Sequence, residues 1–148
     1  MRIGIATDHN GVDQKADLIF FLGEQNCEVL DYSKDNNPTD DYPDFAVRVA
    51  NGIKTNDIDL GILLCGTGIG MSIAANKVKG IRAAKVSTND EARLAREHNN
   101  ANIICLSYKE SPQKLKEMIE IFINTPFSNQ ERHARRVNKI SELENNGN

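Results

Sequence analysis

The sequence predicts an α/β fold in which a five-stranded parallel sheet lies between two layers of helices. Short apolar runs alternate with helical patterns along the whole chain, which is typical of parallel βαβ units. A chain of 148 residues, 39% of them hydrophobic, can bury the core of one domain but is too short for two substantial ones. We therefore expect residues 1–148 to form a single-domain, three-layer α/β/α sandwich.

The N-terminal half is expected to supply three strands and two helices. Its strands are the apolar runs at residues 2–7, 28–31 and 58–64. The first helix spans residues 12–22 and ends before Gly23. Its buried face is expected to consist of Val12, Ala16, Ile19 and Phe20. A polar loop over residues 32–42 follows, and Pro43 opens a helix at residues 44–54, because proline suits the first helical turn.

The C-terminal half continues this alternation. Two further apolar strands are expected at residues 82–86 and 102–106. Helix formers favour helices at residues 71–77 and 89–98, and Pro112 opens another that extends to residue 123. A final helix over about residues 129–144 precedes a polar tail, so we expect an extended C-terminal helix beyond the sheet.

Composition argues against several classes of function. The formal net charge of −3 does not suit a general nucleic-acid binder, which needs a dominant basic surface. Three cysteines without a CxxC pair do not make a disulfide framework and suit a reducing compartment. No apolar stretch has the length of a membrane span or of a signal-peptide core. We therefore expect a soluble, cytoplasmic protein that binds neither nucleic acid nor membrane.

The most informative segment joins the third expected strand to the helix after it. Cys65 is followed at once by Gly66, Thr67, Gly68, Ile69 and Gly70. Glycines allow a sharp turn that exposes backbone N–H groups, and the start of the next helix adds partial positive charge. Such a loop suits an anion, either a phosphate or a developing oxyanion, with a thiol beside it.

Met71 argues against two familiar uses of this loop. A dinucleotide-binding loop needs a glycine at that position, and a cysteine phosphatase needs an arginine there to hold the phosphoryl group. Two alternatives remain for Cys65. It is a base for proton abstraction, a role open to a thiolate stabilised by backbone dipoles, or it is a buried thiol that packs like a small apolar residue.

Other polar residues are expected near this loop. Ligands bind open parallel sheets at the carboxyl ends of the strands. There we expect to find together Asp8, His9, Tyr42, Cys65 to Gly70, His98 and Asn99. The Asp8–His9 pair has a second interpretation, as a cap of the first helix with Asn10. Arg132 and Arg136 stand four residues apart and share a helix face, which either grips a phosphate or is simply solvated.

The remaining cysteines and an acidic cluster are given no functional role. Cys27 and Cys105 lie in strand-like runs without polar neighbours and are expected to be packing residues. Asp40, Asp41 and Asp44 are expected at the surface. No ligand spacing indicates a metal site, so we expect neither a metal nor a cofactor.

Taken in order along the chain, these motifs resemble the type B ribose-5-phosphate isomerases, in a sugar-phosphate isomerase family that also contains the galactose-6-phosphate isomerase subunits. The resemblance runs nearly end to end. It is carried by Thr7-Asp8-His9, Asp41-Tyr42-Pro43, Cys65 to Gly70, Ala74-Ala75-Asn76-Lys77, Gly80-Ile81-Arg82-Ala83-Ala84, His98-Asn99-Asn100-Ala101-Asn102, and Arg132-His133 with Arg136.

The resemblance implies a Rossmann-like enzyme of the pentose phosphate pathway. It would interconvert D-ribose 5-phosphate and D-ribulose 5-phosphate through an enediolate, without a cofactor. Cys65 would be the base that moves a proton between C1 and C2, and Thr67 its hydrogen-bonding companion. The oxyanion hole would be formed by the loop amides of Gly66, Gly68, Ile69 and Gly70.

The resemblance also implies roles outside this loop. His98, assisted by Asp8, would open the sugar ring. The sugar would be contacted by Tyr42 and Asn99, and the phosphate would be held by His9, Arg132 and Arg136. In the family the site lies between two subunits, so a homodimer or a dimer of dimers is implied, with the C-terminal helix packing on the partner.

The chain belongs to one branch of the family and departs from the common pattern in two places, after the fifth strand and at Asn10, where a small residue is common. Some members carry a glutamate base where this chain has Met71, which places it in the cysteine branch. After the fifth strand the family usually has a glycine-rich turn ending in arginine, whereas Ser107-Tyr108-Lys109 stand here. The alternatives are an isomerase of a six-carbon sugar phosphate, such as allose 6-phosphate or galactose 6-phosphate, and a non-catalytic phosphosugar-binding regulator.

Overall fold

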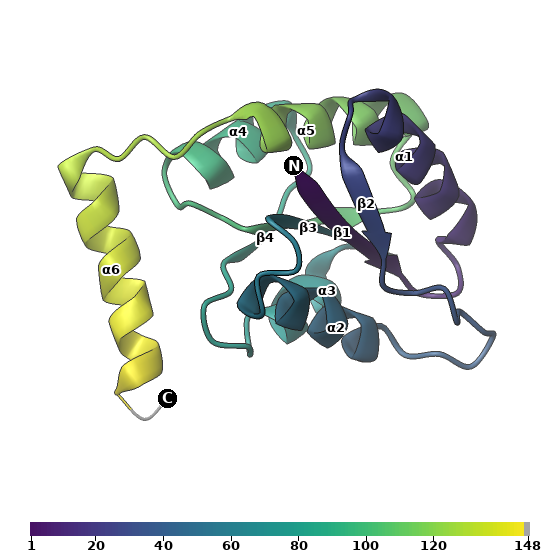
Figure 1. Ribbon diagram of the computed structural model, residues 1–148, viewed down its shortest axis with the longest axis horizontal. Coiled ribbons are helices and arrows are strands. Elements are labelled where there is room, and N and C mark those ends of the chain that lie inside the picture. The colour runs from purple at the N-terminus through teal and green to yellow at the C-terminus, as the bar shows by residue number, and fades with distance from the viewer. Residues whose placement is uncertain (147–148) are drawn as a thin grey trace.

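The computed structural model describes residues 1–146, which form five strands and six helices (Figure 1). The strands are β1 (Arg2–Thr7), β2 (Glu28–Asp31), β3 (Leu60–Cys65), β4 (Ala83–Lys85) and β5 (Ile103–Ser107). The helices are α1 (Val12–Glu24), α2 (Tyr42–Lys54), α3 (Ile69–Ala75), α4 (Asn89–Glu97), α5 (Pro112–Asn124) and α6 (Glu131–Asn145). The predicted types and order of these elements are confirmed, with boundaries that differ by at most two residues. The last two residues of the expected polar tail lie outside the described residues.

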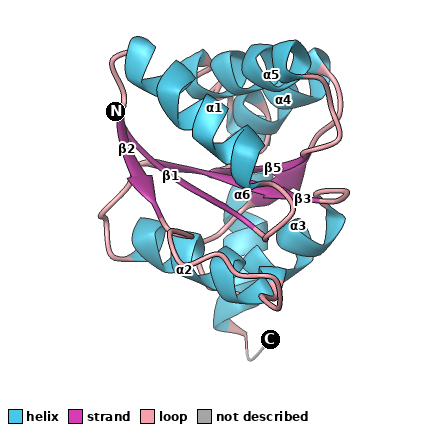
Figure 2. Ribbon diagram, turned by 90° about the vertical axis from the view of Figure 1, so that its right-hand side faces the viewer, coloured by secondary structure: helices cyan, strands magenta, loops and turns pink. Residues whose placement is uncertain are grey.

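Neighbouring strands are all parallel, in the order β2-β1-β3-β5-β4. Helices α1, α4 and α5 cover one face of the sheet, and α2 and α3 cover the other (Figure 2). The predicted three-layer α/β/α arrangement is therefore confirmed. Strand β3 lies at the centre, between β1 and β5, and its last residue, Cys65, is in register with Ser107 of β5.

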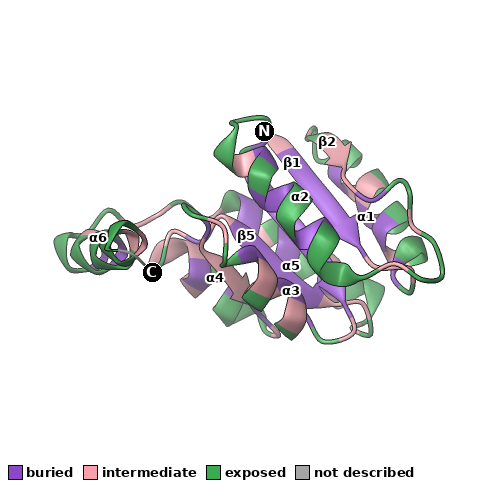
Figure 3. Cartoon of the chain, turned by 90° about the horizontal axis from the view of Figure 1, so that it is seen from below, coloured by how far each residue is buried: buried purple, intermediate pink, exposed green. Residues whose placement is uncertain are grey.

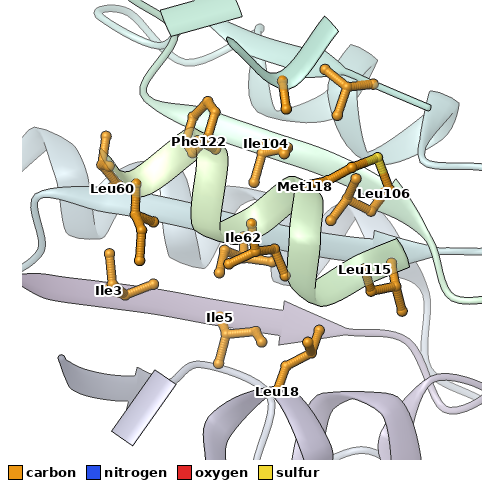
Figure 4. Packing of buried hydrophobic residues seen from close by; sticks show 14 of the residues in the cluster. Ile3, Ile5, Leu18, Leu60, Ile62, Ile104, Leu106, Leu115, Met118 and Phe122 are labelled. Atoms are coloured by element: carbon orange, nitrogen blue, oxygen red, sulfur yellow. The ribbon is translucent and has the colours of Figure 1, made fainter. Parts of the chain in front are cut away.

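Alternate side chains of β3 enter two hydrophobic cores, one on each face of the sheet. Ile62 and Leu64 belong to the core that includes Phe122 of α5 (Figure 4). Leu63 and Cys65 belong to the core formed with α2 and α3. Every residue of β3 is buried. A strand that is buried on both faces gives a continuous apolar run, which explains why this strand could be recognised in the sequence.

The buried face of α1 differs from the predicted one. Of the predicted residues Val12, Ala16, Ile19 and Phe20, only Ile19 is even partly buried, and Phe20 is 70% exposed. The buried residues of this helix are Lys15, Leu18 and Leu22. Lys15 did not belong to the predicted apolar face, yet it is buried, because its ammonium group lies 3.1 Å from Asp31 Oδ2. The helix also continues through Gly23, which was expected to stop it.

Helix α6 stands apart from the three layers and is largely exposed (Figure 1, Figure 3). Near its start the ring of His133 packs on His98, with the ring centroids 4.2 Å apart. Near its end Glu144 accepts a hydrogen bond from the Gly80 amide at 2.9 Å. Ile140 of α6 lines a groove of about 610 Å³ between the helix and β4. Like the other helices of residues 1–146, α6 is too short or too polar to cross a membrane.

We expect Phe122→Ala to lower the free energy of unfolding by about 3–5 kcal/mol, because it removes a fully buried ring and leaves a cavity. Phe20→Ala, on another helix and at an exposed ring, is the matched control and should cost less than about 1 kcal/mol. Urea unfolding at one protein concentration, followed by circular dichroism, measures both. Equal losses for the two variants would contradict this placement of the core.

Candidate active site

Cys65 ends β3 at the carboxyl edge of the sheet, and its sulfur is held by the glycine-rich loop that follows. The residue is 4% exposed, and the amide N–H of Gly68 donates a hydrogen bond to Sγ at 3.1 Å. In the same loop the amide of Ile69 donates to Thr67 Oγ1 at 3.1 Å. The loop predicted from the sequence therefore exists, with a backbone donor directed at the thiol.

The conformation of Gly68 determines the shape of this loop. Its φ of 80° lies in the left-handed region, which favours glycine. A Cβ at this position would also come within 3.1 Å of backbone atoms of Cys105 and Leu106 on β5. The turn therefore packs directly on the backbone of the neighbouring strand, where no side chain fits.

Two tyrosines flank the loop. A Cβ on Gly70 would overlap the ring of Tyr42, so this predicted site residue does lie against the start of α3. Tyr108, directly after β5, was not predicted as a site residue. Its amide donates to the Cys65 carbonyl at 3.1 Å, and its hydroxyl lies 3.6 Å from where a Cβ on Gly66 would be. Its place after a predicted strand was the signal that could have identified it.

Asp8 and His9 follow β1 at the same edge of the sheet. Asp8 Oδ1 accepts a hydrogen bond from the amide of Asn10 at 3.0 Å, which closes the turn before α1. The pair does not cap the helix, since the N-cap residue is Gly11, which has no side chain to accept a hydrogen bond from the first turn. The ring Nδ1 of His9 lies 2.7 Å from Asp40 Oδ1, and this hydrogen bond raises the pKa of His9.

The side chain of Asp40 is buried, although the sequence predicted this residue at the surface. Its side chain is 4% exposed, whereas the neighbouring Asp41 and Asp44 are exposed as predicted. Burial alone would raise the pKa of Asp40, but hydrogen bonds from Asn36 and His9 outweigh it and lower the pKa to about 2. A run of acidic residues gives no sign of this, because the burial arises from the folded loop between β2 and α2.

His98 and Asn99 lie at the edge of the sheet opposite Cys65, which corrects the prediction that they join it. They follow α4 and precede β5, whose first residue pairs with Gly61 near the start of β3. A strand rises about 3.3 Å per residue, so the path from Gly61 to Cys65 separates the two edges by roughly 13 Å. The arrowheads of β1 and β2 accordingly point away from α6 (Figure 1). Within one chain, Asp8 therefore does not assist His98.

Arg132 and Arg136 lie on α6, on the same side of the molecule as His98. Both are exposed, and in residues 1–146 neither has a carboxylate at ion-pair distance. Between them in the sequence, His133 packs on His98 and places its Nδ1 2.7 Å from Ser128 Oγ. Burial, followed by the charges of His98 and the two arginines, lowers the pKa of His133. His133 was given no role in the sequence, yet it fixes the start of α6 on the body.

The other cysteines lie outside this arrangement. Cys105 is fully buried on β5, and burial raises the pKa of its thiol. Cys27 is half-buried near the start of β2. Within the described part of the chain, no three His, Cys, Asp or Glu side chains lie close enough together to hold a metal ion.

Comparison with known proteins extends the likeness to nearly the whole chain. The sequence model of the Ribose/Galactose Isomerase family matches residues 3–140. The probable ribose-5-phosphate isomerase B of Mycoplasma pneumoniae is 42% identical over 140 residues, which cover 93% of this chain and 91% of that protein.

Solved structures agree with this likeness. Ribose-5-phosphate isomerase B of Clostridium thermocellum has a TM-score of 0.93 and 42% identity, with 98% of each chain covered. The Mycoplasma genitalium enzyme of the same name, solved with bound ribulose 5-phosphate, has a TM-score of 0.92 and 42% identity, covering 98% of this chain and 97% of that one. The chain therefore belongs to the ribose/galactose isomerase family.

Proposed function

We propose that residues 1–148 form one isomerase domain that interconverts D-ribose 5-phosphate and D-ribulose 5-phosphate in the cytoplasm. The observation that carries this proposal is the position of the Cys65 sulfur, which accepts a hydrogen bond from a backbone N–H inside a glycine-rich loop at the carboxyl edge of the sheet. Membership of the family and the ribulose 5-phosphate bound by the Mycoplasma genitalium relative support a phosphorylated pentose as the substrate.

The reaction needs a base and a site for negative charge. Removal of the proton on C2 of the aldose is slow in water because the resulting anion is poorly stabilised. In the proposed mechanism the C2–H bond breaks as Cys65, in its thiolate form, takes the proton and becomes the thiol, and the same proton then forms the new C1–H bond and restores the thiolate. A second proton moves from the C2 hydroxyl to the C1 oxygen. Charge on the enediolate is stabilised by amides of the loop.

The hydrogen bonds of the loop divide these amides into two groups. The Gly68 amide is directed at the sulfur, and the Ile69 amide at Thr67 Oγ1. We therefore assign contact with the enediolate oxygen first to the amides of Gly66 and Gly70. The amides of Gly68 and Ile69 support it indirectly, by holding the thiol and the Thr67 hydroxyl in place.

A complete site needs a second copy of the chain. Asp8, His9, Tyr42 and the Cys65 loop form one half, and His98, Asn99, Arg132 and Arg136 form the other, at the opposite edge of the sheet. We propose a homodimer, or a dimer of such dimers, in which each Cys65 loop faces the second half of a partner. The groove beside α6 and the exposed Ile69 and Ile73 of α3, which are 52% and 58% exposed, are the apolar surfaces available for this contact.

In this arrangement, the partner's half supplies ring opening and part of the phosphate site. His98 opens the furanose by acid–base transfer, now with Asp8 of the other subunit. Arg132 and Arg136 grip the phosphate together with His9, because two guanidinium groups on one helix face suit a dianion. Tyr42 and Asn99 contact the sugar hydroxyls. Isomerisation of a six-carbon sugar phosphate and non-catalytic phosphosugar binding remain the alternatives.

Replacing Cys65 tests the proposed base. We expect Cys65→Ala to lower kcat for ribose 5-phosphate by about 10²- to 10⁴-fold, the usual contribution of a positioned base. Initial rates are measured with five- and six-carbon aldose phosphates, and the wild type should turn over the pentose. Cys27→Ala is the matched control and should keep full activity. Retained turnover in folded Cys65→Ala would exclude this base. A wild type that binds ribose 5-phosphate without turnover would favour the regulator.

Mixing variants tests the shared site. The Cys65→Ala protein is mixed in equal amounts with the double variant His98→Ala/Arg136→Ala, and the subunits are allowed to exchange. Half of the resulting dimers contain one subunit of each kind, and one of their two sites is then intact. The mixture should therefore recover about one-quarter of wild-type activity. The control mixes Cys65→Ala with Thr67→Ala, which damage the same half, and should recover nothing. Equal behaviour of the two mixtures would mean that the site lies within one chain.

A further inference from the structure

The Asp40 carboxylate is fully occupied by hydrogen-bond donors. Oδ1 accepts from the backbone N–H of His9 at 3.0 Å and lies 2.7 Å from Nδ1 of its ring. Oδ2 accepts from Asn36 Nδ2 at 2.8 Å and from the amide of Asn37 at 3.1 Å. The side chain is 4% exposed. A buried carboxylate with this many donors remains ionised at any pH at which the protein would work.

The loop that carries Asp40 is itself held by the body of the protein. Asn36 donates a second hydrogen bond to the carbonyl of Thr7, at the end of β1 and two residues before His9, at 2.9 Å. The buried Lys15 ammonium of α1 donates to Ser33 O at 2.9 Å and to Asn36 Oδ1 at 3.2 Å. The position of the carboxylate is thus fixed by contacts with both α1 and β1.

The pairing determines which nitrogen of His9 titrates. An ionised carboxylate only accepts hydrogen bonds, so Nδ1 at 2.7 Å must carry its proton. The other nitrogen, Nε2, then has a lone pair in the neutral ring and becomes a donor only when the ring is cationic. The charged groups acting on this ring are Asp40 and Asp8, both of which favour the cation. About a third of the His9 side chain is exposed to solvent.

We propose that Asp40 is a positioning residue that fixes the His9 ring and keeps it cationic, so that Nε2–H donates to the dianionic phosphate of the substrate. This inference rests on the proposed function, which places His9 in the phosphate site. A neutral His9 held through Nδ1 would present a lone pair to the phosphate oxygens and repel them. The Asp40 charge therefore acts on substrate binding and not on the proton transfer at Cys65.

Kinetics of Asp40→Asn as a function of pH test this role. At pH 7.5 an imidazole with an ordinary pKa near 6.5 is only about one-tenth protonated, so KM should rise by up to roughly tenfold with little change in kcat. The ratio of variant to wild-type KM should fall toward one at pH 5.5, where His9 is protonated without help. The phosphate titrates equally in both proteins and cancels in the ratio. A ratio independent of pH would mean that Asp40 only supports the loop, and would overturn the proposal.

Two further variants separate charge from structure. Asp41→Asn removes a neighbouring exposed carboxylate and should leave KM unchanged across this pH range. In a His9→Gln background, where KM is already raised, Asp40→Asn should raise KM little further, because its effect acts through the His9 ring. Full additivity of the two substitutions would contradict the proposal.

A measurement on wild type alone remains decisive if Asp40→Asn fails to fold or if ribose 5-phosphate is not the substrate. Two-dimensional NMR of the imidazole C–H groups follows the three histidines with pH, and the spectrum of His9→Gln assigns His9. The hydrogen bond to Asp40 raises the pKa of His9, so its midpoint should lie above the ordinary value of about 6.5, and inorganic phosphate should move it higher still. A His9 midpoint at or below 6.5 overturns the proposal whatever the enzyme turns over. A raised midpoint in a protein without isomerase activity would instead refute only the proposed function.

Discussion

The common direction of the five strands is the constraint on which the rest of the structure depends. Parallel strands require crossover helices, so residues that follow a strand gather at one edge of the sheet and residues that precede a strand gather at the other. Cys65 and His9 belong to the first group, and His98 belongs to the second. Topology alone, without any particular loop conformation, therefore separates the thiol from the residues with which the proposed reaction must combine it.

Burial of charge fixes the conformation of the edge that carries the thiol. A buried ammonium or carboxylate is tolerated only where partners satisfy it, and both Lys15 and Asp40 meet this condition through the loop between β2 and α2. Each interaction restricts the loop to one arrangement. The helix face that departs from the predicted pattern and the acidic residue that departs from its predicted exposure are thus two parts of one network, joined at Asn36.

The sequence was sufficient for the order and type of the elements, because strands buried on both faces and prolines at helix starts leave local patterns. It was also sufficient for the glycine loop and for Tyr42 beside it. It failed where long-range pairing reverses a local rule: Lys15 is buried by Asp31, and Asp40 by His9 and Asn36. His98 was placed at the wrong edge of the sheet. A sequence motif shows which residues are neighbours along the chain, but the edge at which it lies depends on whether it precedes or follows a strand, and His98 precedes β5.

The contact of Gly68 with the backbone of β5 bears on how such a site changes over evolution. The turn that holds the sulfur packs on main-chain atoms of Cys105 and Leu106, so its shape at Gly68 depends on backbone contacts more than on the identity of those side chains. Lys109, which is exposed two residues beyond the end of that strand, can change in size and charge without altering this turn. The backbone contact that holds the thiol is thus separate from the exposed residues around the site. Changes in those exposed residues can alter the range of substrates while the chemistry at Cys65 stays the same.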